Sequence, residues 1–135
     1  MNLIEITPPQ SMIFEDNKVI VALAFQPNTK GHCVVIWKSG AEDLNKLPTE
    51  DYEYLMDVVD VTRNTLRTFY KVDKVYLMYL DETNWVHWHL IPRYEEKVFN
   101  ILRHSPETIT DFSDAVELSK IFNDQAKKMI VESVK

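Results

Sequence analysis

Short apolar runs separated by polar turns fill the first third of the chain. The runs 12–14, 19–25 and 32–37 are apolar apart from His32, which opens the third run, and polar stretches join them at 15–18 and 26–30. The middle run contains no polar residue, which is the pattern of a strand buried on both faces. Because both connections are short, we predict that the three runs are strands of an antiparallel meander.

A helical period follows between residues 49 and 70. Thr49, behind Pro48, can accept amide hydrogen bonds at the helix start, and the acids that follow complement the positive end of the helix dipole. Apolar side chains then recur at Tyr52, Leu55, Met56, Val59, Leu66, Phe69 and Tyr70, with Glu53, Asp57, Asp60, Asn64 and Arg67 on the other side. This pattern predicts a long amphipathic helix that covers one face of the sheet.

The second half of the chain repeats the strand pattern and ends in a helical one. Residues 75–80 predict a fourth strand, and the four residues 81–84 join it to a fifth strand that carries His87 and His89. A connection this short predicts an antiparallel hairpin. A C-terminal helix is predicted to start near Ser113. Its buried side is predicted to comprise Val116 or Ala115, Leu118, Phe122, Gln125 and Met129.

These elements define the fold class. They predict an α+β domain built on a five-stranded antiparallel sheet, with one long helix and one C-terminal helix. Residues 1–11 are predicted to form an extended lead-in, whereas 98–102 fits neither pattern clearly. At 135 residues and 45% hydrophobic content, the chain suits a single domain, 1–135, with a sizeable core.

Charge and glycine content exclude several classes of function. The formal net charge of -6 makes a nucleic-acid polymer an unexpected partner, although a single nucleotide could still find a local pocket. The two glycines, Gly31 and Gly40, are too few for a phosphate-binding loop or a dinucleotide-binding fingerprint. We therefore expect no cofactor of the ATP or NAD type.

The cysteine content and the first residues bear on the compartment. Cys33 is the only cysteine, which excludes an internal disulfide and a paired-cysteine zinc site and favours a reducing compartment. Residues 1–6 lack the basic start and long apolar run of a secretory signal, and no segment reaches the roughly 18 apolar residues of a membrane span. We expect a cytoplasmic protein without a membrane partner.

Two histidines stand two residues apart on the predicted fifth strand. His87 and His89 should therefore point to the same face, about 7 Å apart at their Cα atoms, while Val86, Trp88 and Leu90 take the other face. Such a pair can supply a nucleophile with a helper, a general acid and base, or half of a metal site. The spacing alone leaves all three open.

Other residues could join this pair. His32 opens the third strand and could reach the pair or serve a structural role, whereas His104 lies in a Ser-Pro loop, which predicts a solvated side chain. Cys33 should point away from His32, because neighbours on a strand face opposite ways. A metal site would add His32 or Glu82 as a third ligand. No carboxylate stands at a clear ligand spacing, so no metal is expected.

The run 85–93, Trp-Val-His-Trp-His-Leu-Ile-Pro-Arg, resembles the signature of the histidine triad family of nucleotide hydrolases and transferases. Gly31 and His32 before an apolar strand, and Pro48 before a long helix, are similar to that family as well, and the resemblance spans residues 13–95. The chain departs from the family pattern at three places. Trp85 occupies the position of the first triad histidine, and Ala24 occupies a position where the family commonly has a ribose-binding Asn or Asp. Residues 81–84 form a shorter connection in place of a glycine-containing phosphate loop.

The resemblance implies a chemistry for these positions. His87 would attack the α-phosphorus of a nucleotide ester, an anhydride such as a dinucleoside polyphosphate, or a phosphoramidate, and water would hydrolyse the nucleotidyl-histidine. His89 would be the second catalytic residue. Substrate would be bound by His32, Thr83, Asn84 and Trp85, together with backbone amides.

The resemblance also implies a homodimer whose two sheets join edge to edge. Val58 and Val61 flank the apolar stripe of the 49–70 helix and widen it beyond what one sheet face needs, which favours the same conclusion. Two alternatives stay open. One is a nucleotide-binding or interaction protein with weak or no catalysis, for which Trp85 is the main evidence. The other is a metal-dependent enzyme built on the His-x-His pair.

Overall fold

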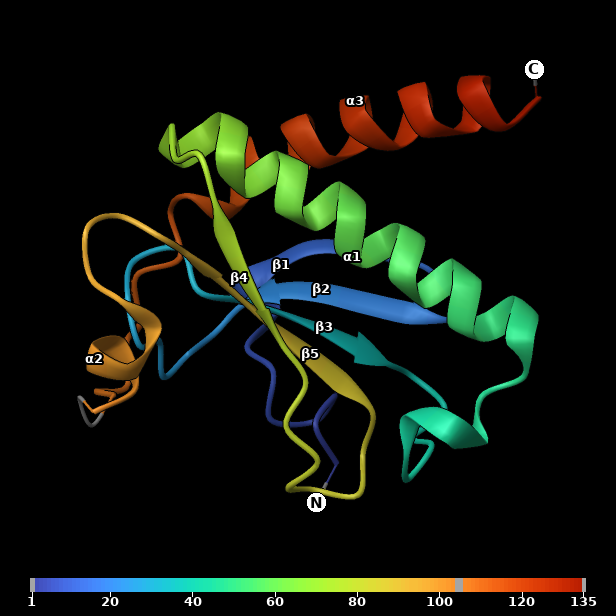
Figure 1. Cartoon of the computed structure of the whole chain (residues 1–135), viewed down its shortest axis with the longest axis horizontal. Coiled ribbons are helices and arrows are strands. Elements are labelled where there is room, and N and C mark those ends of the chain that lie inside the picture. The colour runs from blue at the N-terminus through green and yellow to red at the C-terminus, as the bar shows by residue number, and fades with distance from the viewer. Residues whose placement is uncertain (1, 104–105, 135) are drawn as a thin grey trace.

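The computed structural model describes residues 2–103 and 106–134, and their side chains as far as residue 128. The described residues form five strands and three α-helices (Figure 1). The strands are β1 (Met12–Glu15), β2 (Val19–Leu23), β3 (Cys33–Trp37), β4 (Val75–Met78) and β5 (His87–Pro92). The α-helices are α1 (Thr49–Tyr70), α2 (Val98–Leu102) and α3 (Ala115–Val134), and short 3₁₀ helices lie at Pro9–Ser11 and Leu44–Lys46.

The five strands form one antiparallel sheet in the order β1-β2-β3-β5-β4. The predicted α+β fold, its meander and its hairpin are therefore confirmed. β2 and β4 each end two residues before the predicted boundary. The carbonyl of Phe25 accepts the backbone N–H of Ile109 instead of a strand partner, and the carbonyl of Leu80 accepts from Glu82 in a turn. Phe25 and Leu80 therefore take no part in the hydrogen bonding between strands.

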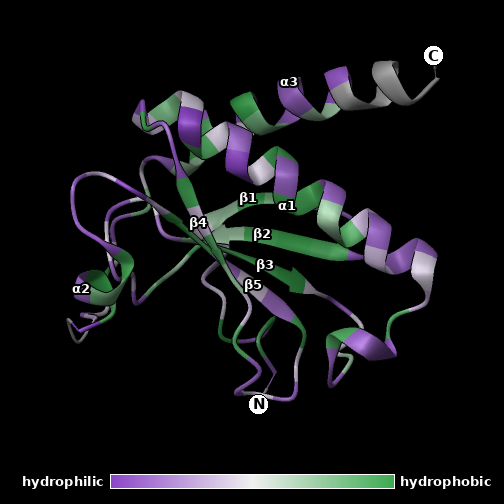
Figure 2. Ribbon diagram, viewed as in Figure 1, coloured by the Kyte–Doolittle hydropathy of each residue, from purple (hydrophilic) through white to green (hydrophobic). Residues whose placement is uncertain are grey.

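Helices α1 and α3 lie over one face of the sheet (Figure 1). Strands β2 and β3 are apolar along most of their length, whereas α1 alternates between apolar and polar residues (Figure 2). The periodicity of the sequence thus predicts which side of α1 packs inward. The core on this face includes Val19, Val21, Leu23, Cys33, Val35, Trp37, Leu55, Val59, Leu66, Val86, Leu90, Leu118 and Phe122.

Val58 and Val61 belong to this core and not to an open surface. They are only 4% and 3% exposed, and they share their buried cluster with Phe122 of α3. Phe122 also stacks on Phe14 of β1, with ring centroids 4.6 Å apart. The interpretation of these valines as a dimer surface is therefore wrong, because the C-terminal helix of the same chain covers them.

The N-terminal segment folds over the opposite face of the sheet. Leu3 is 9% exposed and packs with Ile20, Ala22 and Ile36. The segment turns back on itself, since the Thr7 hydroxyl donates to the carbonyl of Leu3 at 2.6 Å. The predicted extended lead-in is therefore wrong: its apolar side chains gain more by covering the sheet than by staying in water.

The C-terminal half settles two open points of the sequence pattern. The ambiguous stretch at 98–102 is the short helix α2. In α3, Ala115 and Leu118 are buried while Val116 is 64% exposed, so Ala115 is the inward-facing residue. Gln125 is half-buried, and the side chain of Met129 lies outside the described residues. None of the described helices has the length and apolar character needed to cross a membrane.

Candidate functional site

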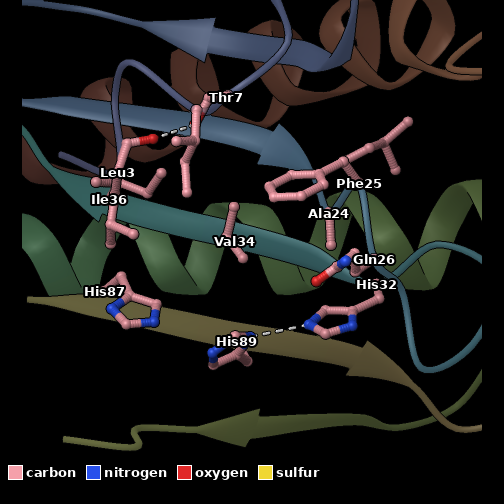
Figure 3. A pocket seen from close by; sticks show the side chains of 12 residues that line it. Leu3, Thr7, Ala24, Phe25, Gln26, His32, Val34, Ile36, His87 and His89 are labelled. Carbon is pink, nitrogen blue, oxygen red and sulfur yellow. Dashed lines mark hydrogen bonds between the residues drawn. The ribbon is translucent and has the colours of Figure 1, made fainter. Parts of the chain in front are cut away.

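Strand β5 places His87 and His89 on the face that the N-terminal segment covers. Across β3, His87 pairs with Ile36 and His89 with Val34, and paired residues of antiparallel strands share a face. His32 reaches the same place from the loop before β3. The three imidazoles form a row with His89 in the middle (Figure 3), and the centroid of its ring lies 4.9 Å from that of His87 and 5.2 Å from that of His32.

One short hydrogen bond fixes the protonation of His87. Its Nδ1 lies 2.7 Å from the backbone carbonyl oxygen of Trp85. A carbonyl can only accept, so Nδ1 carries the proton and donates. In the neutral ring the lone pair then sits on Nε2, which is the form of imidazole that can act as a nucleophile.

A chain of hydrogen bonds fixes the two other imidazoles. The backbone N–H of Asn28 donates to Nδ1 of His32 at 3.1 Å, so that nitrogen carries a lone pair. The proton of His32 therefore sits on Nε2, which lies 3.0 Å from Nδ1 of His89 and donates to it. His89 must then carry its own proton on Nε2. Three hydrogen-bonding groups in series thus present His89 as an N–H donor.

Burial keeps this histidine pair uncharged. Burial, and after it the proximity of His89, lowers the pKa of His32 from 6.5 to about 3. Burial, and after it the proximity of His87, lowers the pKa of His89 to about 4. A charged imidazole in this place would lose its hydration and face a neighbouring ring. Both side chains are therefore neutral at pH 7.

A cavity of about 170 Å³ opens beside the histidines. Most of its lining is apolar, and the three imidazoles lie together along one side (Figure 3). The lining residues are Leu3, Ile6, Thr7, Leu23, Ala24, Phe25, Gln26, His32, Val34, Ile36, His87 and His89. An apolar slot with a few convergent polar groups is the usual form of a small-molecule site.

Sequence reasoning missed the part of the cavity wall that comes from Leu3, Ile6 and Thr7. A signal was present, because apolar residues recur at 3, 4 and 6 in a segment that otherwise looks like a linker. Ala24, in contrast, lines the cavity at the position where the resemblance places a ribose-binding residue. The methyl side chain offers no hydrogen bond there.

Three of the predicted substrate-binding residues lie outside the lining of this cavity. Thr83 is half-buried, and its hydroxyl lies 3.5 Å from the carbonyl of Trp85. Asn84 is exposed and adopts a positive φ of 51°. The indole of Trp85 lies on the histidine face, but its Nε1 donates to the carbonyl of Trp37 at 2.7 Å. Of the predicted binding residues, His32 is the one brought into the cavity wall.

The other candidate ligands stay apart from the histidines. Glu82 is exposed, and Cys33 is fully buried on the helix-covered face, where burial raises the pKa of its thiol. His104 lies outside the described residues. Among the residues whose side chains the structure describes, 2–103 and 106–128, no group of three or more histidine, cysteine, aspartate or glutamate side chains is placed to hold a metal ion.

Comparisons with known proteins agree with this architecture. An uncharacterised HIT-like protein of Methanocaldococcus jannaschii is 28% identical over 95 residues, which cover 64% of this chain and 71% of that protein. A zinc-bound histidine triad protein from Mycobacterium smegmatis has a TM-score of 0.71 at 20% identity, covering 90% of this chain and 89% of the other.

Two further crystal structures are similar. A hypothetical histidine triad nucleotide-binding protein from Sulfolobus tokodaii has a TM-score of 0.66 at 21% identity, covering 88% of this chain and 85% of the other. A Hit-like protein from Bartonella henselae has a TM-score of 0.67 at 24% identity, covering 85% of each chain. At these identities the structures establish the fold. A model of the HIT domain matches residues 6–96, two thirds of the sequence. The chain therefore belongs to the HIT domain family.

Proposed function

We propose that this protein is a nucleotidyl hydrolase or transferase that cleaves at the α-phosphate of a nucleotide through a nucleotidyl-histidine at His87. The bond from His87 Nδ1 to the carbonyl of Trp85 carries the proposal, because it leaves Nε2 with the free lone pair on a side chain that lines the cavity. Family membership supports it. The description of the Sulfolobus tokodaii relative, a hypothetical nucleotide-binding protein, supports a nucleotide as ligand.

The first step joins His87 to the nucleotide. Nε2 attacks the α-phosphorus of an ester, anhydride or phosphoramidate, an N–P bond forms, and the bond to the leaving group breaks with its electron pair. An alcohol, polyphosphate or amine departs and takes any proton it needs from solvent. In the second step water attacks the phosphorus, releases the nucleotide and a proton, and returns the electron pair to Nε2.

His89 is the group that stabilises the phosphoryl oxygens in this scheme. Its Nε2–H is the end of a donor chain that starts at the backbone of Asn28 and passes through His32. Because the donor is already oriented before substrate arrives, little reorganisation is needed when negative charge develops on phosphorus. Thr83 and Asn84, in the connection before β5, are proposed to add contacts to the phosphate or the leaving group.

The apolar part of the cavity is proposed to hold the nucleoside. Leu3, Phe25 and Ile36 are among its walls, and removing the faces of a base from water against such side chains is favourable. Gln26 and Thr7 are polar groups on the same lining. The leaving group and the identity of the base are outcomes for the assay to determine.

The test compares wild type, His87→Ala and His89→Asn on an adenosine phosphoramidate and a dinucleoside polyphosphate. His87→Ala should lose turnover by at least about 10³-fold because the attacking atom is gone. His89→Asn should stay active but be about 10²- to 10⁴-fold slower, the range for a lost acid or donor. Rapid acid-free quenching of the wild type should yield a nucleotidyl-protein that His87→Ala does not form.

Equal turnover in wild type and His87→Ala would refute the mechanism. AMP binding to the wild type by titration, without turnover of either substrate, would instead identify a nucleotide-binding protein that has lost catalysis. Stoichiometric zinc with loss of activity on chelation would favour the metalloenzyme alternative.

A further inference from the structure

The carbonyl that orients His87 belongs to a residue outside the regular strand. Trp85 precedes β5, in the irregular connection that follows β4, and Asn84 before it has a positive φ of 51°. No cross-strand ladder therefore sets the direction of the Trp85 carbonyl. Something else must hold it within 2.7 Å of the imidazole.

The turn after β3 holds the peptide that contains this carbonyl. The N–H of Val86 belongs to the same planar peptide as the carbonyl of Trp85, and the two point in opposite directions. That N–H donates to the carbonyl of Ala41 at 2.8 Å. The carbonyl of Val86 in turn accepts from the N–H of Trp37 at 3.1 Å.

The indole of Trp85 makes a second connection to the same turn. Its Nε1–H donates to the carbonyl of Trp37 at 2.7 Å. Its six-membered ring packs on Gly40, where a Cβ would come within 3.0–3.1 Å of three ring carbons. Trp85 is therefore held at two points: at the peptide that joins it to Val86, and at its indole. Together they restrict rotation of that peptide and hence of the Trp85 carbonyl.

We propose that Trp85 is a positioning residue for His87: its indole, bonded to Trp37 and packed on Gly40, fixes the carbonyl that holds the nucleophile in its reactive tautomer. The role fits the location of the indole, which lies on the histidine face but outside the cavity lining. It also gives a function to a tryptophan where the family signature has a histidine. The catalytic part of this inference rests on the proposed function, whereas the tautomer part does not.

Trp85→Phe removes the indole hydrogen bond together with the outer ring that packs on Gly40. The variant keeps an aromatic ring and removes the donor, and Trp37 is not left without a partner, because its carbonyl also accepts from the N–H of Gly40 at 3.3 Å. Trp88→Phe is the matched control. Trp88 lies three residues further along the chain, packs with the helix-covered core, and its Nε1 makes no hydrogen bond to any residue the structure describes.

The measurement is two-bond proton–nitrogen NMR of the full chain labelled with ¹⁵N-histidine, with His87 assigned by its absence from His87→Ala. Wild type and Trp88→Phe should show the Nδ1–H tautomer of His87. Trp85→Phe should show loss of that population toward the Nε2–H form that a free histidine side chain favours. Benzothienylalanine at position 85, which keeps the shape of tryptophan and lacks the N–H, should give the same shift even if phenylalanine disturbs packing.

Kinetics give the second readout. Trp85→Phe should lower kcat about two- to tenfold, the size expected for one lost hydrogen bond, while KM stays within about twofold. An unchanged His87 tautomer in both position-85 variants would overturn the proposal. Because the spectrum needs no substrate, an inactive wild type would count against the proposed function while the role of Trp85 is still decided by the tautomer.

Discussion

Acid should destabilise this fold through the pair of buried neutral histidines. The pKa values of His32 and His89 in the folded protein, about 3 and about 4, lie below the ordinary value of 6.5. Between the folded-state pKa values and 6.5, the histidines of the unfolded chain bind more protons than those of the folded chain. The free energy of unfolding therefore falls as the pH falls. The stabilising contribution is complete above pH 6.5 and is lost progressively down to the folded-state values.

The magnitude between pH 8 and pH 5 follows from the unfolded chain alone, because both folded-state pKa values lie below 5. At pH 5 the ordinary histidine pKa lies about 1.5 pH units above the solution pH, and each unit corresponds to about 1.4 kcal/mol. Each buried histidine should therefore cost about 2 kcal/mol of stability over this range. That is a large share of the roughly 5–15 kcal/mol by which small domains are typically stable.

The perturbation that tests this is His89→Asn. The asparagine Oδ1 stands near the place of imidazole Nδ1 and can still accept from Nε2 of His32, but it does not titrate. Urea unfolding at pH 8 and pH 5 should show the wild type losing about 2 kcal/mol more than the variant. Carboxyl groups titrate in both proteins, so their contribution cancels in the difference.

Asn28→Ala is the control, because it keeps the backbone N–H that bonds to His32 and should keep the wild-type pH dependence. If wild type and His89→Asn lose the same stability between pH 8 and pH 5, the histidines are not buried as neutral groups. The tautomer assignment that depends on their neutrality would then be refuted as well.

Three further results are expected. Ala24→Asn should raise the preference for ribonucleotides over 2′-deoxynucleotides about fivefold, since it adds a hydrogen-bonding group at a position that offers none; an unchanged ratio would refute this. Turnover should survive treatment with a chelator, and the purified protein should contain less than stoichiometric metal, because Nε2 of His32 and Nδ1 of His89 are hydrogen-bonded to each other. Light scattering should give twice the chain mass of 15.9 kDa, and a monomer at micromolar concentration would contradict the expected homodimer.

The sequence predicts the fold well where the signal is local and periodic. Period-two alternation places His87 and Val86 on opposite faces of the sheet, and the structure pairs His87 with Ile36 on one side while burying Val86 in the core on the other. The helical period of α1 identifies its buried face in the same way. These inferences need no knowledge of distant residues.

The same reasoning fails where distant segments compete for one surface. From the sequence alone, Val58 and Val61 are expected to form an exposed apolar surface, because the pattern of α1 does not reveal that α3 packs over them. The N-terminal segment reads as a linker because Leu3 and Ile6 have no periodicity, and only the open apolar face of β2 and β3 explains why they fold back. Contacts of this kind depend on the finished topology.

The protonation of the site is another property that spacing could not give. The spacing of His87 and His89 permits a nucleophile, an acid–base pair or a metal site in equal measure. Two backbone groups set the protonation: the carbonyl of Trp85 requires a proton on Nδ1 of His87, and the N–H of Asn28 forbids one on Nδ1 of His32. Backbone groups in irregular connections, which no pattern of side chains predicts, thus determine which ring nitrogen carries the lone pair.

Under the proposed function, the charge of the site restricts how a phosphate is recognised. Among the described residues that line the cavity there is no lysine or arginine, and His32 and His89 are neutral at pH 7. Attraction of an anionic substrate must then come from oriented N–H groups at short range and from burial of the nucleoside, not from a long-range positive field. This suits a chain with a net charge of -6, which repels polyanions at a distance and can still bind a single phosphate whose donors are fixed in advance. It also explains why the donor chain through His32 matters: without a cation, the direction of each N–H carries the stabilisation.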